Sequence, residues 1–261
     1  MSAIIIDDGL VHFEALGRGN PVIFLHGWLG SWRYWVPVME ELSVEYRAYA
    51  FDLWGFGDSD RRNGSYDVES YVQLLDGFIE NLGMLHAPLP VVGHGLGAIV
   101  AVLWAARNPG RIDRIMAVGM PLVGAAINRR LTTSGALGLF DKVFNTPPPD
   151  FEALRLETFK ADEAAIIESV HSVMGLDMQR ELQRVDLPAL LVYGERDNIV
   201  SPDIGDAFAK SELVRSIFLS ESRHFPMLDE RPRFNRLLRD FLIAESLESL
   251  SLKEEWRRQT R

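Results

Sequence analysis

The chain has 261 residues, of which 47% are hydrophobic and 25% charged, as is usual for a globular protein. Acidic residues outnumber basic ones, 37 to 27, and the formal net charge is −10. This balance argues against a nucleic-acid partner, because phosphates are bound by clustered Lys and Arg. The sequence has no cysteine, which excludes disulfides, thiolate catalysis and cysteine-ligated metals.

The N-terminal stretch MSAIIIDDGLVHFE has a short apolar run with no basic region before it, so it does not match a secretory signal. The longest apolar run, AIVAVLWAA, is too short to span a bilayer. We therefore expect a protein without a membrane span that resides in the cytoplasm.

Short β-rich runs alternate with helical patterns along most of the chain, which predicts crossover units and a mainly parallel sheet of the α/β class. This alternation stops near Pro121 and resumes at 187. We expect a small helical cap over 122–185, inserted into a core formed by 1–121 and 186–261. The predicted strands are 3–6, 10–16, 21–27, 46–53, the first part of 89–106, 111–120, 187–197 and 214–221. The predicted helices are 35–43, 67–84, the second part of 89–106, 203–210, about 230–243 and the tail after 244.

The stretch LPVVGHGLGAIVAVLWAA, residues 89–106, predicts a strand, a tight glycine turn and an apolar helix. One site type with this pattern is a dinucleotide fold, in which Gly-x-Gly-x-x-Ala from Gly93 to Ala98 would hold a phosphate at the helix N-terminus. That fold also needs an acidic residue at the end of the next strand. Here the next strand ends in VGMP, and Asp113 lies at its beginning, so the pattern favours the second type.

The second site type is the nucleophile elbow, Gly-x-nucleophile-x-Gly, in which a strand turns sharply into a helix and raises one side chain above the sheet. GHGLG, residues 93–97, fits except that Gly95 stands where the nucleophile would be. The other parts follow in the expected order: Asp197 in VYGERDNIVSP comes just past a strand, and His224 in SESRHFPMLDERP follows the next strand. FLHGWLG supplies a turn from which the Trp28 N–H can stabilise an oxyanion.

On these motifs, and on the DLWGFGDS turn, the sequence resembles the α/β-hydrolase superfamily between about residues 10 and 244. The likeness is to small capped members related to esterases, C–C hydrolases and cofactor-free haloperoxidases. It implies a mostly eight-stranded sheet with a helical cap. It also implies that Asp197 and His224 are the acid and the base, and that Trp28 and Leu96 donate the oxyanion N–H groups. No metal cluster, Walker-type loop or nicotinamide site is evident, so we expect no metal and no cofactor.

Gly95 departs from that family, whose members carry Ser, or less often Asp or Cys, at this position. Without a side chain, no acyl-enzyme or alkyl-enzyme can form there. Three hypotheses follow. The protein is a hydrolase of small apolar esters or related acyl compounds that the glycine inactivates or strongly impairs, or it is a natural non-catalytic protein that binds a ligand in the pocket. The third hypothesis is a cofactor-free lyase or oxygenase with His224 as general base. The first is favoured because Asp197 and His224 are both present.

Other residues near these motifs carry less specific signals. Trp32, Phe140 and Phe144 are expected to line an apolar substrate pocket, although aromatic residues at helical spacing are as often core residues. Ser31 lies near the oxyanion loop, and nothing near it in the sequence would activate it. The remaining candidates are expected to have structural roles: His12, His26, Asp52 and His94.

Overall fold

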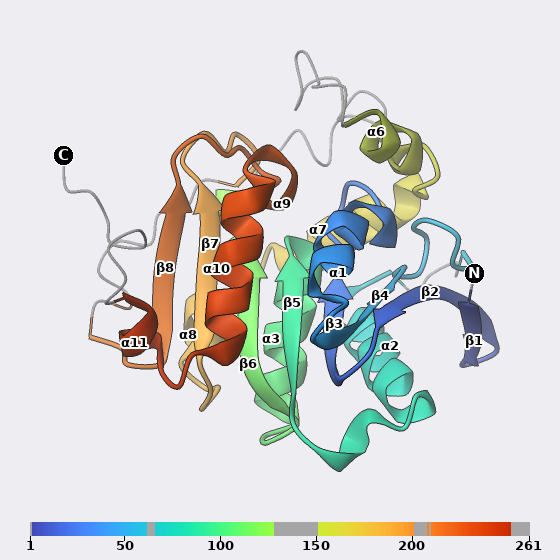
Figure 1. Cartoon of the computed structure of the whole chain (residues 1–261). Helices are drawn as coiled ribbons and strands as arrows, with labels where there is room; N and C mark the ends of the chain where they lie inside the picture. Colours follow the sequence, from blue (N-terminus) through green and yellow to red (C-terminus); the bar gives the residue numbers. More distant parts are fainter. Residues whose placement is uncertain (1, 62–65, 128–150, 201–207, 209, 252–261) are drawn as a thin grey trace.

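The computed structural model describes residues 2–61, 66–127, 151–200, 208 and 210–251. Its strands are β1 (Ser2–Ile6), β2 (Gly9–Gly17), β3 (Asn20–Leu25), β4 (Tyr46–Phe51), β5 (Leu89–His94), β6 (Ile112–Val118), β7 (Ala189–Gly194) and β8 (Val214–Leu219). They form one eight-stranded sheet in the order β1-β2-β4-β3-β5-β6-β7-β8 (Figure 1). β1 and β2 are antiparallel to their neighbours, and the strands from β4 to β8 in this order pair in parallel. The expected mainly parallel α/β sheet is confirmed.

Helices cover both faces of this sheet (Figure 1). On one face α1 (Val36–Leu42) packs against α10 (Arg231–Ile243), and on the other α2 (Val68–Asn81) packs against α3 (Leu96–Arg107). α10 buries one stripe that includes Phe234, Leu238 and Phe241, at the spacing of a one-sided helix. In contrast, α3 is buried from Leu96 to Ala105, because it contacts β5 and β6 as well as α2 and α8 (Met178–Leu182).

Between β6 and β7 the chain leaves the sheet and forms α6 (Glu152–Thr158), α7 (Glu163–Val173) and α8. α6 and α7 lie beyond the carboxyl ends of the strands (Figure 1). The division into a core and a cap stays a prediction, and Phe140 and Phe144 lie outside the described residues. The remaining short helices are η1 (Trp32–Trp35), η2 (Met84–His86), η3 (Gly124–Ala126), α9 (Pro226–Asp229) and α11 (Leu247–Ser251).

The tail helix is present in part as α11, where Leu247 and Leu250 are each only 2% exposed, as expected of residues that pack on the core. The predicted helix 203–210 falls mostly outside the described residues. Among the helices that are described, none combines the length and apolar character required to cross a membrane.

Candidate active site

The turn between β5 and α3 is centred on Gly95, whose φ is 50° and ψ is −109°. Side-chain-bearing residues rarely adopt this backbone conformation. The Gly95 N–H donates to the carbonyl of Val118 at the end of β6, at 2.9 Å, and the Gly97 N–H donates to that of His26, at 3.1 Å. These two bonds fix the turn between β6 and the loop that follows β3.

The three glycines of this turn differ in the space around them. A Cβ at Gly93 would lie 2.5 Å from backbone atoms of Ala98, and one at Gly97 would lie 2.6 Å from the His26 carbonyl oxygen, so neither position admits a side chain. A Cβ at Gly95 would instead meet two ring carbons of Trp28 at 3.4 Å and the Cα of Gly27 at 3.7 Å. These are ordinary contacts. Gly93 and Gly97 are required by packing, whereas Gly95 is not.

His224 and Asp197 form a hydrogen-bonded pair, as expected from their order in the chain. The His224 Nδ1–H donates to Asp197 Oδ2 at 2.8 Å, and the two side chains are 5% and 1% exposed. The other oxygen, Oδ1, accepts the N–H groups of Ile199 at 2.8 Å and Val200 at 3.1 Å, so the carboxylate is fixed in place. This arrangement sets the tautomer of His224 and leaves Nε2 as the nitrogen that can exchange a proton with a ligand.

The loop after β3 carries His26, Gly27 and Trp28. His26 Nδ1–H donates to the Gly27 carbonyl at 2.8 Å, and the Leu53 N–H donates to His26 Nε2 at 2.9 Å. Both ring nitrogens are therefore used by the backbone, and burial lowers the pKa of His26. Its role is to brace the loop, as the sequence predicts. The Trp28 indole N–H donates to Ser169 Oγ of α7 at 3.0 Å and so connects this loop to the helices above the sheet.

His94 is also buried and structural. Its ring lies 4.6 Å from that of His224, between centroids, and its two nitrogens contact Tyr34 and the His224 carbonyl. Burial, followed by the nearby His224, holds the pKa of His94 well below its ordinary value of 6.5, so the ring is neutral. Its nitrogens are both bonded within the protein, which agrees with the expectation that it does not replace the nucleophile.

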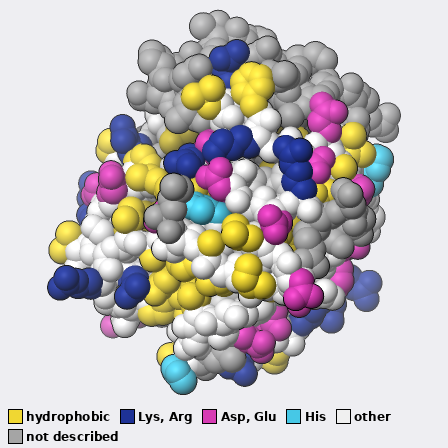
Figure 2. Space-filling view, turned by 90° about the vertical axis from the view of Figure 1, so that its right-hand side faces the viewer, with side chains coloured by type: hydrophobic (Ala, Val, Ile, Leu, Met, Phe, Trp, Pro, Cys, Tyr) yellow, Lys and Arg dark blue, Asp and Glu magenta, His cyan; other side chains and the backbone are white. Residues whose placement is uncertain are grey.

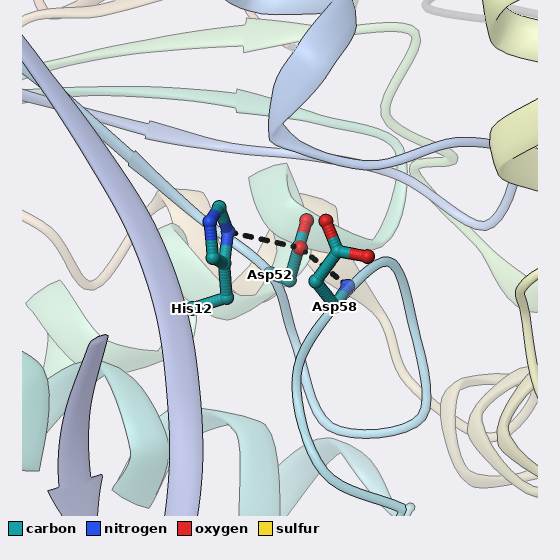
Figure 3. Close-up of side chains that lie close together, drawn as sticks. All are labelled: His12, Asp52 and Asp58. Carbon is teal, nitrogen blue, oxygen red and sulfur yellow. Dashed lines mark hydrogen bonds and ion pairs between the residues drawn. The ribbon is translucent and has the colours of Figure 1, made fainter. Parts of the chain in front are cut away.

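Asp52 holds the turn after β4, as the glycine-rich sequence indicates. Its Oδ1 accepts the Trp32 N–H at 2.9 Å and its Oδ2 accepts the Asp58 N–H at 2.8 Å. His12 points toward the same carboxylate, with Nδ1 3.5 Å from Oδ2 (Figure 3). These three side chains are close enough to hold a metal ion. However, the oxygens of Asp58 already face Arg33 Nη2 at 3.0 Å and Lys160 Nζ at 2.8 Å, and an ion would have to displace both cations, so we assign no metal here.

Ser31 has a partner that the sequence did not reveal. Its Oγ donates to Glu157 Oε2 of α6 at 2.8 Å, and Glu157 Oε1 also lies 3.0 Å from both Arg33 Nε and Lys160 Nζ. Because Glu157 is held by two cations as well as by the Ser31 hydroxyl, we assign this contact a structural role. It joins α6 to the core across 126 residues, a separation at which no local sequence signal exists.

Figure 2 shows Lys and Arg interspersed with Asp and Glu on the face that it displays.

Among the described residues, two aromatic rings that the sequence did not single out lie near the base. The Phe225 ring lies 5.3 Å from His224 and 6.1 Å from Phe151, between centroids. The Trp32 ring instead lies 5.5 Å from His12 and 4.8 Å from the Arg33 guanidinium carbon, and its contact with a substrate stays a prediction. Phe225 directly follows His224 in the sequence, and this adjacency could have predicted that its ring lies near the base.

Comparison with known proteins now adds to this geometry. The family described as "Alpha/beta hydrolase family" matches residues 22–237, which is most of the chain. The chain belongs to the alpha/beta hydrolase family. It is 27% identical to the AB hydrolase superfamily protein YisY of Bacillus subtilis, over 87% of this chain and 93% of that protein. It is 26% identical to the pimeloyl-[acyl-carrier protein] methyl ester esterase of Chromobacterium violaceum, over 89% of this chain and 98% of the esterase.

Among solved structures, this alpha/beta hydrolase is similar to a serine-to-glycine mutant of the N-acyl homoserine lactonase AidH, determined in complex with N-hexanoyl homoserine lactone. The TM-score is 0.80 at 21% identity, over 92% of this chain and 96% of the lactonase. At this identity the likeness establishes the shared fold.

Proposed function

We propose that this alpha/beta hydrolase has the acid–base pair and oxyanion donors of a Ser-His-Asp hydrolase for small apolar esters or related acyl compounds. Gly95 stands where the serine nucleophile would be, so the chain as written is inactive or strongly impaired. The observation that carries the proposal is the difference among the turn glycines: Gly93 and Gly97 have no room for a Cβ, whereas Gly95 keeps a strained backbone and room for one.

With a serine at this position, each part has a defined task. His224 Nε2 would accept the hydroxyl proton while the oxygen attacks the acyl carbon, and Asp197 would stabilise the resulting imidazolium. Leu96 begins α3, where an N–H has no partner within the helix, and this N–H with that of Trp28 would hold the oxyanion. With glycine, the attack step is lost while the binding and oxyanion groups are retained.

The glycine form is therefore suited to hold an acyl compound without turning it over. The lactonase with a Ser-to-Gly mutation that carries a bound lactone supports this reading, because it shares the fold. The similarity to a methyl ester esterase favours esters as the compound class.

The test is the hydrolysis of p-nitrophenyl acyl esters by the chain as written and by Gly95→Ser. Loss of a serine nucleophile costs about 10⁶ in turnover in a serine protease, so we expect the substitution to raise the rate by several orders of magnitude. The strained φ should make serine cost about 1–3 kcal/mol of stability.

Gly83→Ser is the matched control, because Gly83 also has a positive φ, of 65°, and has no atom within 4 Å of its Cβ position. It should show no gain in rate and a smaller loss of stability, because its ψ of 30° places it in the left-handed α region that side-chain-bearing residues can adopt. If Gly95→Ser is folded by circular dichroism and remains as inert as the chain as written, the hydrolase proposal is wrong.

A second candidate function is base catalysis without a covalent intermediate, as in a lyase or oxygenase. The retained Asp197–His224 hydrogen bond favours it, since a fixed base can act on water or on a ligand C–H or O–H. His224→Ala should abolish such an activity in the chain as written. If His224→Ala changes nothing and acyl compounds still raise the melting temperature, the remaining hypothesis is a ligand-binding protein.

A further inference from the structure

A chain of three buried hydrogen bonds connects the loop of Trp28 to the loop of His224. The Gly27 N–H donates to Tyr34 Oη at 2.7 Å, the Tyr34 hydroxyl donates to His94 Nδ1 at 3.0 Å, and His94 Nε2–H donates to the His224 carbonyl at 3.0 Å. Tyr34, His94 and His224 are each at most 5% exposed. The connection therefore runs from the loop of Trp28, through the residue that precedes Gly95, to the loop of His224.

Every proton in this chain has one possible position. A carbonyl can only accept, so His94 donates from Nε2, and in a neutral imidazole the other nitrogen, Nδ1, is then an acceptor. Tyr34 must donate to His94 Nδ1, and His94 must carry its proton on Nε2. Burial supports both states, since it raises the pKa of Tyr34 well above its ordinary value and holds that of His94 well below.

Two glycines beside these rings provide the space that the rings occupy. A Cβ at Gly27 would lie 2.9 Å from His94 Nδ1, and a Cβ at Gly119 would lie 3.0 Å from His224 Cε1 and 3.4 Å from His94 Nε2. Phe225 packs on the other side, 4.7 Å from the His94 ring between centroids. The His94 ring therefore fits beside the backbone because Gly27 and Gly119 lack side chains, and it packs on Phe225 while it makes both bonds.

We propose that Tyr34 and His94 are positioning residues that hold the oxyanion loop and the His224 loop in one fixed relative geometry. The inference rests on the proposed function, because it assigns these two loops to the oxyanion donors and the base. His94 directly precedes Gly95. Its side chain therefore fixes the position of the His224 loop relative to the turn that would carry the nucleophile. Small errors in such geometry are costly, since about 1 Å of displacement can lower a rate about 100-fold.

The first experiment uses the chain as written and needs no catalysis. The His224 Nδ1–H, bonded to Asp197, should give a low-field proton NMR signal that is protected from exchange with water. His94→Leu removes the donor and the acceptor and should broaden or abolish this signal. His94→Gln keeps an acceptor for Tyr34 and a donor for the His224 carbonyl, and should preserve it.

The second experiment places the same changes in the Gly95→Ser background. We expect His94→Leu to lower kcat about 10- to 100-fold with little change in KM, and His94→Gln to restore most of it. Tyr34→Phe removes one hydrogen bond and should lower kcat by a smaller factor.

Tyr71→Phe is the matched control, because Tyr71 is also buried and its hydroxyl donates to the Trp54 carbonyl at 3.0 Å. It should lower stability without changing the NMR signal or kcat.

The outcomes separate the two proposals. If Gly95→Ser has no esterase activity while the NMR signal still depends on His94, the proposed function fails and the positioning role stands. If folded His94→Leu keeps both the signal and the kcat, the positioning role is wrong. If His94→Leu does not fold, Tyr34→Phe is the deciding variant. The inference fails if the NMR signal and the kcat of Tyr34→Phe match those of Tyr71→Phe.

Discussion

Two buried carboxylates of this chain lie beside histidine rings, and they serve different purposes. Asp197 accepts the Nδ1–H of His224 at 2.8 Å. Asp52 is completely buried, yet its nearest histidine nitrogens, on His12 and His26, lie at 3.5 and 3.9 Å. Its oxygens accept backbone N–H groups instead. One carboxylate orients a ring and the other orients a turn.

The histidines of the chain differ in how many of their ring nitrogens are already bonded within the protein. Both nitrogens of His26 are bonded to backbone groups, and both nitrogens of His94 are bonded to Tyr34 and the His224 carbonyl. His224 has one nitrogen bonded to Asp197, and within the described residues its Nε2 has no hydrogen-bond partner, as the proposed function requires. Proximity of His to Asp is therefore a weak sign of catalysis, and the count of ring nitrogens already used is a stronger one.

The largest expected effect comes from removing the charge of Asp197. In the Gly95→Ser background, Asp197→Asn should lower kcat about 10⁴-fold, because an amide group that faces Nδ1 favours the wrong tautomer of His224. The measurement is the initial rate of p-nitrophenyl ester hydrolysis at saturating substrate.

Asp52→Asn is the matched control for that change. It should leave kcat within a few-fold and instead destabilise the fold by about 1–3 kcal/mol, because one buried backbone N–H then faces an NH₂ group. A large loss of kcat in stable, folded Asp52→Asn would contradict the assignment of Asp52 to the turn.

Much of the fold was predictable from the sequence because it depends on local patterns. Each buried strand is a short apolar run that ends in glycine or another turn residue, and all eight strands lie where these runs predict them. The pairing of Asp197 with His224 was also predictable, because both residues follow neighbouring parallel strands and parallel strands end at the same edge of a sheet.

The contacts that fix the site were not predictable, because they join segments with no local relation. Tyr34 meets His94 across 60 residues, and Ser31 meets Glu157 across 126. Each such contact depends on how whole elements pack, and the sequence pattern of a single element does not encode it. The need for glycine at Gly93 and Gly97 was visible in the motif, whereas the room at Gly95 follows from the place of the Trp28 ring.

A smaller effect should appear in the pH dependence of stability. The pKa values of His26 and His94 are lowered in the folded state, chiefly by burial, from an ordinary value of 6.5. As the pH falls below this value, the unfolded chain takes up protons that the folded chain does not, so their contribution to stability is complete above it and declines below it. Each histidine adds up to about 1.4 kcal/mol per pH unit to this slope.

Thermal unfolding between pH 8 and pH 5 measures this slope. His94→Gln, which keeps the two hydrogen bonds, should make the melting temperature less sensitive to acid. His171→Gln reports the effect of removing an exposed histidine from α7. A slope that is identical in the chain as written and in His94→Gln would mean that His94 is not held neutral by the fold.

The smallest change in stability is expected at His12, whose ring lies beside Asp52. It tests directly whether Asp52, unlike Asp197, is independent of its neighbouring histidine. The His12 side chain is 6% exposed, neither ring nitrogen has a hydrogen-bond partner among the described residues, and the ring packs on Trp32. His12→Phe keeps an aromatic ring of similar size and removes two buried polar atoms, so the free energy of unfolding should change by less than about 1.5 kcal/mol. Urea denaturation measures it, with His12→Ala as the control for lost packing. If His12→Phe destabilises the fold more than Asp52→Asn does, the contact of His12 with Asp52 at 3.5 Å holds the carboxylate in place, and Asp52, like Asp197, depends on a histidine partner.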